Sequence, residues 1–166
     1  MKGKFIISII CFLLLATAFV THIYTSAEED KRKGHHSASE IAQNNGFEKV
    51  DNISTYHSRH TYYVVQGKNK NGEKIIGWMK KGNDNILVKK ADEGLSKKEV
   101  LQLVQEVAGE KPKEIRKIML GFDDSKQPTW DIPVWEVQFI DQQNRYTYLI
   151  VSFTDERVYK IYSIKQ

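Results

Sequence analysis

Two pairs of adjacent acidic residues, Asp123-Asp124 and Asp155-Glu156, are the first places in this sequence where catalysis could occur. Neighbouring carboxyl groups act as a general acid and a general base when burial separates their pKa values. Both pairs adjoin residues that favour turns, such as Gly121. Carboxylates in turns are usually solvated and stabilise the turn itself. We therefore expect both pairs to be exposed and to have a structural role.

The histidines are the candidates for a metal site. His57 and His60 are three residues apart in a strand-like segment, and an extended backbone sends such side chains to opposite faces. His35 and His36 are adjacent, and they bind a metal only if further ligands converge on them. We expect polar, solvated histidines, with no metal and no cofactor. A small enzyme or metal sensor built on these histidines is a third hypothesis for function.

Motifs for catalysis are missing from the sequence. There is no nucleophile elbow, P-loop, HExxH or CxxC, and the single cysteine, Cys11, lies in an apolar run. The chain has 25 basic residues, of which Lys2 and Lys4 precede that run, and 21 acidic residues. The remaining charges nearly balance and alternate along the chain, which is not typical of nucleic-acid binding. The sequence predicts a protein that is not an enzyme and does not bind nucleic acid.

Aromatic residues are the clearest functional signal. The second half of the chain contains Trp130, Tyr146 and Tyr148 among several others. A sheet of four short strands with one helix has too little interior for all of them. Aromatic side chains left on the surface are typical of protein-binding patches. We predict that these three residues bind a protein partner.

The N-terminal segment has the length and composition of a membrane-spanning helix. Phe5–Tyr24 contains no formal charge, and as a helix it spans roughly 30 Å, the thickness of the hydrocarbon core of a bilayer. Lys2 and Lys4 precede it and acidic residues follow it, so we expect a cytoplasmic N-terminus and an extracellular body. A signal peptide cleaved near residues 25–27 is the alternative, although signal peptides have shorter apolar runs.

The rest of the chain repeats one pattern. Ser37–Glu40 and Ser96–Glu99 both read S-x-x-E, the capping box that begins a helix. Tyr63–Asn69 also matches Trp135–Asp141 in type, residue by residue, at several positions. We therefore predict a cytoplasmic tip and anchor in residues 1–27, a charged stalk in 28–36, a first unit in 37–92 and a second in 93–166.

Each unit is expected to hold one helix and a small antiparallel sheet, which gives an α+β fold. The helix of the second unit has one apolar face and ends at Gly109. Short β-branched and aromatic segments bounded by turn residues predict the strands. The expected strands are Lys49–Tyr56, Thr61–Gly67, Lys74–Lys80, Ile86–Lys90, Glu114–Gly121, Val134–Ile140, Tyr146–Phe153 and Val158–Ile164.

Several of these segments also carry a likeness to a known family. They are Leu95–Glu99, Tyr62–Val65 with Trp78, Val134–Val137 and Tyr146–Tyr148. With them the chain resembles the TseB-like cell wall elongation regulators of Gram-positive bacteria. The resemblance implies a single N-terminal membrane helix followed by two PepSY-like repeats of cystatin-like shape. It supplies no catalytic residue.

The resemblance also implies a function. It suggests a single-pass, non-enzymatic membrane protein whose extracellular module regulates cell wall elongation by binding a class B penicillin-binding protein. The alternative is an inhibitor or propeptide-like binder of an extracellular protease, because PepSY-type domains also occur in such roles. The sequence leaves open whether binding activates or inhibits the partner, and in which oligomeric state the protein acts.

Overall fold

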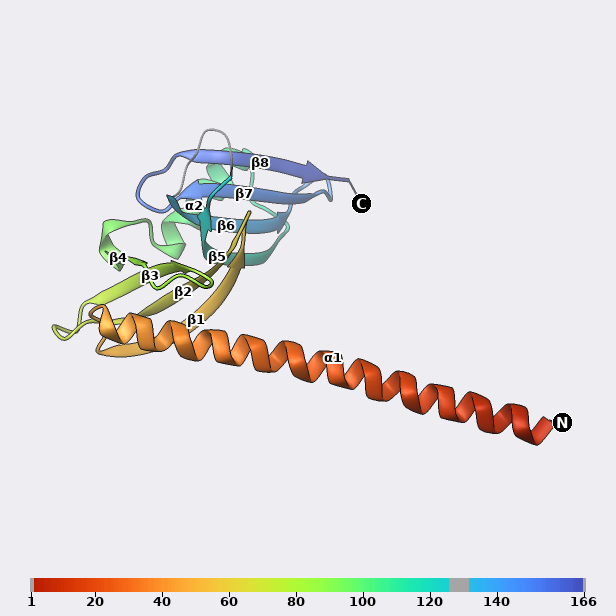
Figure 1. The fold of residues 1–166 in the computed structure, drawn as a ribbon. Coiled ribbons are helices and arrows are strands. Elements are labelled where there is room, and N and C mark those ends of the chain that lie inside the picture. Colours follow the sequence, from red (N-terminus) through yellow and green to blue (C-terminus); the bar gives the residue numbers. More distant parts are fainter. Residues whose placement is uncertain (1, 126–131, 166) are drawn as a thin grey trace. The chain divides into compact units, whose positions relative to one another are not determined.

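The computed structural model describes the backbone of residues 2–125 and 132–165, and the side chains of residues 12–125 and 132–165. It divides into two compact units, residues 1–37 and residues 38–166. The first unit is helical, and the second holds two four-stranded antiparallel sheets with helices (Figure 1). The predicted α+β class is confirmed.

Helix α1 (Lys2–Asn44) is continuous through the predicted anchor, the predicted stalk and Ser37. Residues 28–36, the predicted stalk, are therefore regular helix, and an ion pair between Lys33 and Glu29 (2.8 Å) lies along them. The predicted helix start at Ser37–Glu40 is wrong. Adding a residue to an existing helix costs far less than starting a new one, so a capping sequence inside a helix simply continues it.

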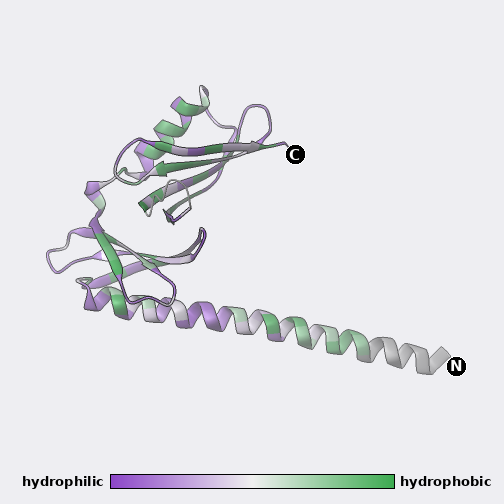
Figure 2. Ribbon diagram, turned by 45° about the horizontal axis from the view of Figure 1, so that its top comes forward, coloured by the Kyte–Doolittle hydropathy of each residue, from purple (hydrophilic) through white to green (hydrophobic). Residues whose placement is uncertain are grey.

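The polarity of α1 changes along its length. Its described part is hydrophobic at first and hydrophilic further along (Figure 2). Residues 5–11 of the predicted apolar run lie outside the described side chains. Among the described residues, no helix is both long and apolar enough to cross a membrane.

All eight predicted strands are present, close to their expected ends. The first sheet has the order β1 (Lys49–His57), β2 (Thr61–Lys68), β3 (Lys74–Lys80) and β4 (Ile86–Lys90). The second has the order β5 (Glu114–Asp123), β6 (Ile132–Ile140), β7 (Tyr146–Ser152) and β8 (Val158–Ile164). A 3₁₀ turn, η1 (Ala91–Glu93), and helix α2 (Lys97–Ala108) connect them.

One face of the first sheet is covered by the end of α1. Ala38 and Ala42 are buried there against Tyr63 and Val65 of β2. Two alanines on one helical face let the helix backbone approach the sheet closely. The helix then ends before Gly46, whose φ of 99° is accessible to glycine at little cost, as the sequence predicted.

Helix α2 covers one face of the second sheet. The capping box is complete: the Ser96 N–H donates to the Glu99 carboxylate (2.7 Å) and the Glu99 N–H to the Ser96 hydroxyl (3.3 Å). Val100 and Val104 are fully buried against β6 and β7. At the other end Gly109 has the left-handed conformation, with φ of 72°. Both predicted ends of this helix are confirmed.

The other face of the first sheet packs against the second sheet. Trp78 of β3 meets Phe153 edge to face at 5.0 Å between ring centroids, and Tyr62 stacks on Phe122 at 4.6 Å. On β5, Gly121 lies directly against the ring of Tyr56, where any Cβ would collide. The first sheet is thus covered on both faces, and β5 is covered by the first sheet.

Two adjacent carboxylates near this junction are buried, contrary to expectation, and one of them, Asp124, bonds across it. Asp123 and Asp124 are only 2% and 7% exposed, so the prediction that they are solvated is wrong. Asp124 accepts hydrogen bonds from the Arg59 N–H (2.9 Å) and the Tyr62 hydroxyl (3.1 Å), and lies 2.5 Å from Nδ1 of His60. All three donors come from the β1–β2 hairpin.

Asp123 is bonded within the second sheet. It accepts from Nζ of Lys160 (2.8 Å) and from the Ser125 N–H (2.9 Å). Burial raises the pKa of both carboxyls, but the hydrogen bonds, from Lys160 to Asp123 and from His60 to Asp124, outweigh it and lower the pKa below its usual range. These carboxylates therefore stay ionised and act as structural acceptors. Asp155 and Glu156 are exposed, as predicted.

The two serines of the S-x-x-E motifs provide a test of the fold. Ser96→Ala removes a true helix cap and is expected to lower the free energy of unfolding by about 1 kcal/mol. Ser37→Ala, in the exposed interior of α1, is expected to leave it unchanged or raise it by a few tenths. Chemical denaturation of both variants measures the difference. An equal loss for Ser37→Ala would show that a helix begins there.

The Asp124 carboxylate predicts a pH dependence. Because its pKa is depressed in the folded state, its stabilisation is present above the unfolded pKa of about 3.9 and is lost as the pH falls further. Asp124→Asn is expected to cost about 1–3 kcal/mol at pH 7 and to flatten the loss of stability below pH 4. Urea unfolding at pH 7 and below pH 4 measures both, with the exposed Asp84→Asn as control. A variant as acid-sensitive as the unmodified protein would contradict the assignment.

Candidate interaction surface

The predicted binding residues differ in how the structure places them. Trp130 lies in residues 126–131, outside the described part of the chain. Tyr146 and Tyr148 lie on β7, two residues apart on one face of the strand, and both are half-buried. Their ring centroids are 5.2 Å apart and their planes tilted by 50°. The structure therefore brings together two of the three predicted residues.

A third tyrosine extends this pair. Tyr162 of β8 is opposite Tyr148 in the register of the sheet, and their rings stack at 4.7 Å and 9°. Tyr162 remains 49% exposed. Tyr146, Tyr148 and Tyr162 form a continuous row, here called the tyrosine row, on the face of the second sheet opposite α2. Leu149 and Val151, on the other face of β7, pack in the α2 core.

Polar groups beside the row hold its rings in place. The Tyr146 hydroxyl donates to Oε1 of Gln138 (3.0 Å), and Nε2 of Gln138 donates to the Glu136 carboxylate (2.6 Å). Burial, then the charge of Glu136, and then Tyr148 raise the pKa of Tyr162. Tyr162 is consequently a neutral phenol at physiological pH. Large, ordered rings with a hydroxyl donor combine apolar contact area with hydrogen bonding, as protein interfaces often do.

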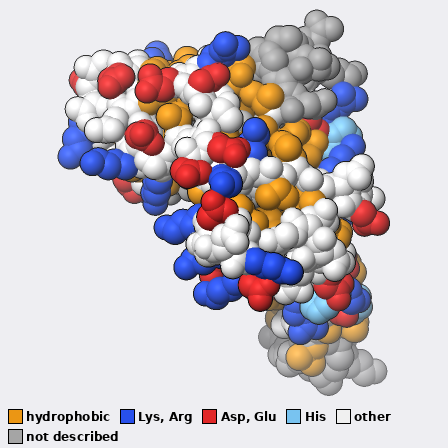
Figure 3. Space-filling view, turned by 90° about the vertical axis from the view of Figure 1, so that its left-hand side faces the viewer, with side chains coloured by type: hydrophobic (Ala, Val, Ile, Leu, Met, Phe, Trp, Pro, Cys, Tyr) orange, Lys and Arg blue, Asp and Glu red, His pale blue; other side chains and the backbone are white. Residues whose placement is uncertain are grey.

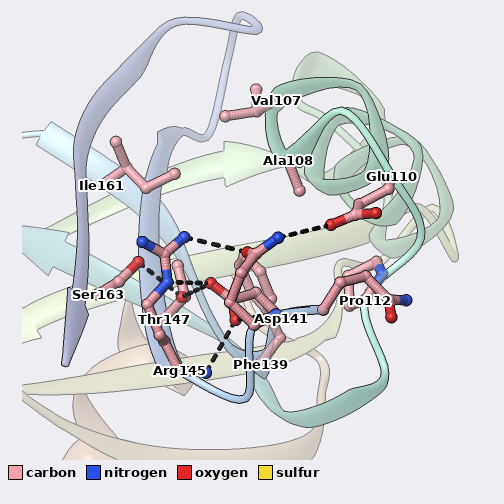
Figure 4. Close-up of a pocket in the computed structure, with 12 residues that line it drawn as sticks. Val107, Ala108, Glu110, Pro112, Phe139, Asp141, Arg145, Thr147, Ile161 and Ser163 are labelled. Carbon is pink, nitrogen blue, oxygen red and sulfur yellow. Dashed lines mark hydrogen bonds and ion pairs between the residues drawn. The ribbon is translucent and has the colours of Figure 1, made fainter. Parts of the chain in front are cut away.

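A cavity lies on the opposite side of the same two strands. It has a volume of about 130 Å³ and lies between the end of α2, the β6–β7 turn and β8 (Figure 4). Val107, Ala108 and Ile161 form an apolar part of its wall, while Asp141, Arg145 and Thr147 supply polar atoms. Val107 and Ile161 are both exposed large hydrophobic residues.

The charged groups of the cavity bind one another. Nε of Arg145 donates to Oδ2 of Asp141 at 2.7 Å, and its backbone N–H donates to Oδ1 at 2.8 Å. Burial raises the pKa of the Asp141 carboxyl, but these bonds from Arg145 reverse the effect and lower it. The Thr147 and Ser163 hydroxyls are hydrogen bonded at 2.8 Å. This arrangement provides a small recess for a side chain, and its carboxylate does not have the raised pKa of a general acid at neutral pH.

The histidines also have local partners. Nδ1 of His57 lies 3.1 Å from the Thr61 hydroxyl, and His60 is hydrogen bonded to Asp124. Within residues 12–125 and 132–165, no three side chains of His, Cys, Asp or Glu are grouped so that they could hold a metal ion. His60 is exposed, as expected, and it also binds a carboxylate distant in sequence, which was not expected.

The surface charges are mixed in sign. On the face in Figure 3, basic and acidic side chains are interspersed, and hydrophobic side chains gather between them. Such a face lacks the broad positive field that steers nucleic acids to their binding proteins.

Tyr162 is the residue that sequence reasoning missed. Its position alone shows only one more aromatic in a strand-like segment. The register supplies the missing signal, because the turn between β7 and β8 sets Tyr146 opposite Ile164 and Tyr148 opposite Tyr162. If the sequences of β7 and β8 are paired as a hairpin about that turn, Tyr148 and Tyr162 fall opposite each other.

The comparisons with known proteins agree with this architecture. Residues 37–80, which contain the end of α1 and strands β1 to β3, match the family model described as the cell wall elongation regulator TseB-like domain. The chain is 29% identical to the probable cell wall elongation regulator TseB of Bacillus subtilis (strain 168), over 96% of this chain and 98% of that protein.

A solved structure has the same fold. The YpmB protein from Bacillus subtilis superposes with a TM-score of 0.67 at 23% identity, over 78% of this chain and 96% of that chain. At this level of identity the likeness is one of fold. Together with the matches in sequence, it confirms the predicted resemblance: residues 37–80 match a TseB-like family model, and the chain is similar over nearly its whole length to a probable cell wall elongation regulator.

Proposed function

We propose that this protein is a non-enzymatic, membrane-anchored interaction module that regulates cell wall elongation by binding a class B penicillin-binding protein outside the cell. The observation that carries the proposal is the tyrosine row. Its three rings contact one another in sequence, Tyr146 tilted against Tyr148 and Tyr148 stacked on Tyr162, whereas the α2 core is completed by other residues of the same strands. Rings ordered in this way are suited to anchoring a protein partner.

The regulatory role is supported by the relatives. The protein matched over nearly its full length is named as a probable cell wall elongation regulator, and the matched family model has the same description. The acidic residues that could have done chemistry are instead used to hold the fold. Asp123, Asp124 and Asp141 are all buried, ionised and hydrogen bonded, which favours a binding role over a catalytic one.

The proposed anchor is Phe5–Tyr24, with Lys2 and Lys4 on its cytoplasmic side. A helix that continues from this segment to Asn44 connects it to the first sheet without an interruption. Attachment to the same membrane as the partner raises the effective concentration, so that an interface of modest affinity is sufficient. The two helix-and-sheet halves of residues 38–166 would be the PepSY-like, cystatin-like repeats that the family resemblance implies.

The topology is tested on intact cells. If the anchor is retained, externally added protease is expected to degrade the body of the protein, and mass spectrometry of untreated protein should recover the N-terminal peptide. Protection from the protease would place the body inside the cell. A mature chain that begins at Glu28 would instead show cleavage of a signal peptide.

The partner is tested by recovery from cross-linked membranes. Tagged full-length protein is expected to recover a class B penicillin-binding protein, and Tyr148→Ala to reduce the affinity about thirty-fold, equivalent to about 2 kcal/mol. Tyr146→Ala and Trp130→Ala test the other predicted residues. Thermal melting of each variant separates binding from folding, since Tyr148 is only half-buried and its loss should spare the fold.

Lys70→Ala is the control, because Lys70 is exposed in the β2–β3 turn of the first sheet. A loss of the partner in Lys70→Ala alone, with normal melting, would move the interface to the first sheet and contradict the assignment. Recovery of an extracellular protease in place of a wall synthase would favour the alternative function of a protease inhibitor.

A further inference from the structure

The two edge strands of the second sheet have different surroundings. Its order is β5-β6-β7-β8, so that in the described part of the chain β8 has a strand neighbour only on the side of β7. At the other edge, the C-terminal half of β5 packs against the first sheet, where Tyr56 lies over Gly121, and the exposed first residues, Glu114–Lys117, include three charged side chains. An edge strand presents backbone N–H and C=O groups that can pair with a further strand.

The side chains of β8 do not block such pairing. Ile161, Tyr162 and Ile164 are 50%, 49% and 53% exposed, and they lie on both faces of the strand. Edge strands that must stay unpaired are usually short or protected by proline, lysine or inward-pointing charges. The one lysine within β8, Lys160, is bonded to Asp123 of the same sheet. The open strand of the first sheet, β4, is shorter, and among its residues only Leu87 is an exposed large hydrophobic residue.

A strand added beside β8 would meet a different surface on each face. Ile161 and Ser163 line the cavity of about 130 Å³ on the α2 side. Tyr162 belongs to the tyrosine row on the other side. Alternate side chains of an added strand would therefore reach the cavity and the tyrosines in turn. In binding by strand addition, backbone pairing supplies affinity and such alternating contacts supply specificity.

The charge of β8 and its flanks selects the occupant. Residues 157–165 contain Arg157, Lys160 and Lys165 and no acidic residue, and the acidic pair Asp155 and Glu156 lies before them in the β7–β8 turn. Lys160 is bonded to Asp123, and no acidic partner in the described part of the chain lies within 4 Å of the Arg157 guanidinium or the Lys165 amine. A second copy of β8 would set this basic strand against itself, and like charges across a strand pair are destabilising. An acidic strand is complementary.

We propose that β8 binds an extended acidic segment of a partner protein as a fifth strand of the second sheet. In this segment acidic residues alternate with apolar ones. The inference rests on the proposed function, since it names the mode by which the partner of the tyrosine row is bound.

The probe is an acetylated and amidated heptapeptide of the sequence DVEIDVE, added to the full-length protein in detergent micelles. Amide hydrogen exchange of residues 158–164 is expected to slow at least ten-fold, while exchange in β4 stays unchanged. N-methylation of the peptide amides along one of its edges should abolish the protection, and methylation along the other edge should not. A peptide with lysine in place of each acidic residue should give none.

The matched variant is the double substitution Arg157→Glu and Lys165→Glu. Thermal melting at the temperature of the unmodified protein shows that it folds normally. It is expected to lose protection by the acidic peptide and to gain it with the lysine peptide. The proposal is overturned if the acidic peptide does not slow exchange in β8, or if methylation along one peptide edge changes the protection as much as methylation along the other edge. It is also overturned if sedimentation shows β8-dependent dimers that the peptide does not dissociate.

The two proposals fail differently. If the charge-reversed protein still recovers the penicillin-binding protein in full while Tyr148→Ala does not, the strand-addition mode is wrong and the proposed function stands. If the acidic peptide protects β8 but no wall synthase is recovered from cells, the strand site stands and the proposed partner is wrong.

Discussion

The packing of the first sheet against the second determines most of what this molecule presents to its surroundings. At its centre Trp78 meets Phe153, and beside them Tyr62 stacks on Phe122. The connection between the sheets is held by the same group, because the Leu95 N–H donates to the Phe153 carbonyl at 2.7 Å. Neither sheet alone has two covered faces, and contact between them supplies the second cover for the first sheet.

The exposed surface follows from this contact. Because Tyr56 and its neighbours pack on the C-terminal half of β5, β8 is the edge of the second sheet that lies away from the first sheet. Because α2 covers one face of that sheet, the tyrosines of β7 and β8 are left on the other. The same packing buries Asp124, so that its carboxylate fixes the β1–β2 hairpin. The surface that we propose for partner binding therefore consists of the strand edge and the tyrosines that the packing leaves uncovered.

Local patterns in the sequence predicted the parts of the fold that depend on local physics. Alternating β-branched and aromatic residues marked the strands, and Ser96 with Glu99 marked the start of α2. The same motif at Ser37 misled, because a helix that arrives from upstream needs no new start. Whether an S-x-x-E motif begins a helix depends on the conformation of the chain before it, and the four residues of the motif do not encode that conformation.

The candidate site was only partly predictable for a related reason. Tyr146 and Tyr148 were identified as surplus aromatics within one strand, but the addition of Tyr162 depends on the register between two strands. The burial of Asp124 depends on donors more than sixty residues earlier in the chain. Residues whose roles arise from contacts distant in sequence, such as these, were the ones misjudged or missed.

The claim that the tyrosine row contacts a wall synthase can be tested most directly by photo-cross-linking in living cells. A benzophenone amino acid placed at position 162 should form an adduct with a class B penicillin-binding protein, while the same group at position 70 should not. Adducts of that protein from position 70, with none from position 162, would contradict the claim.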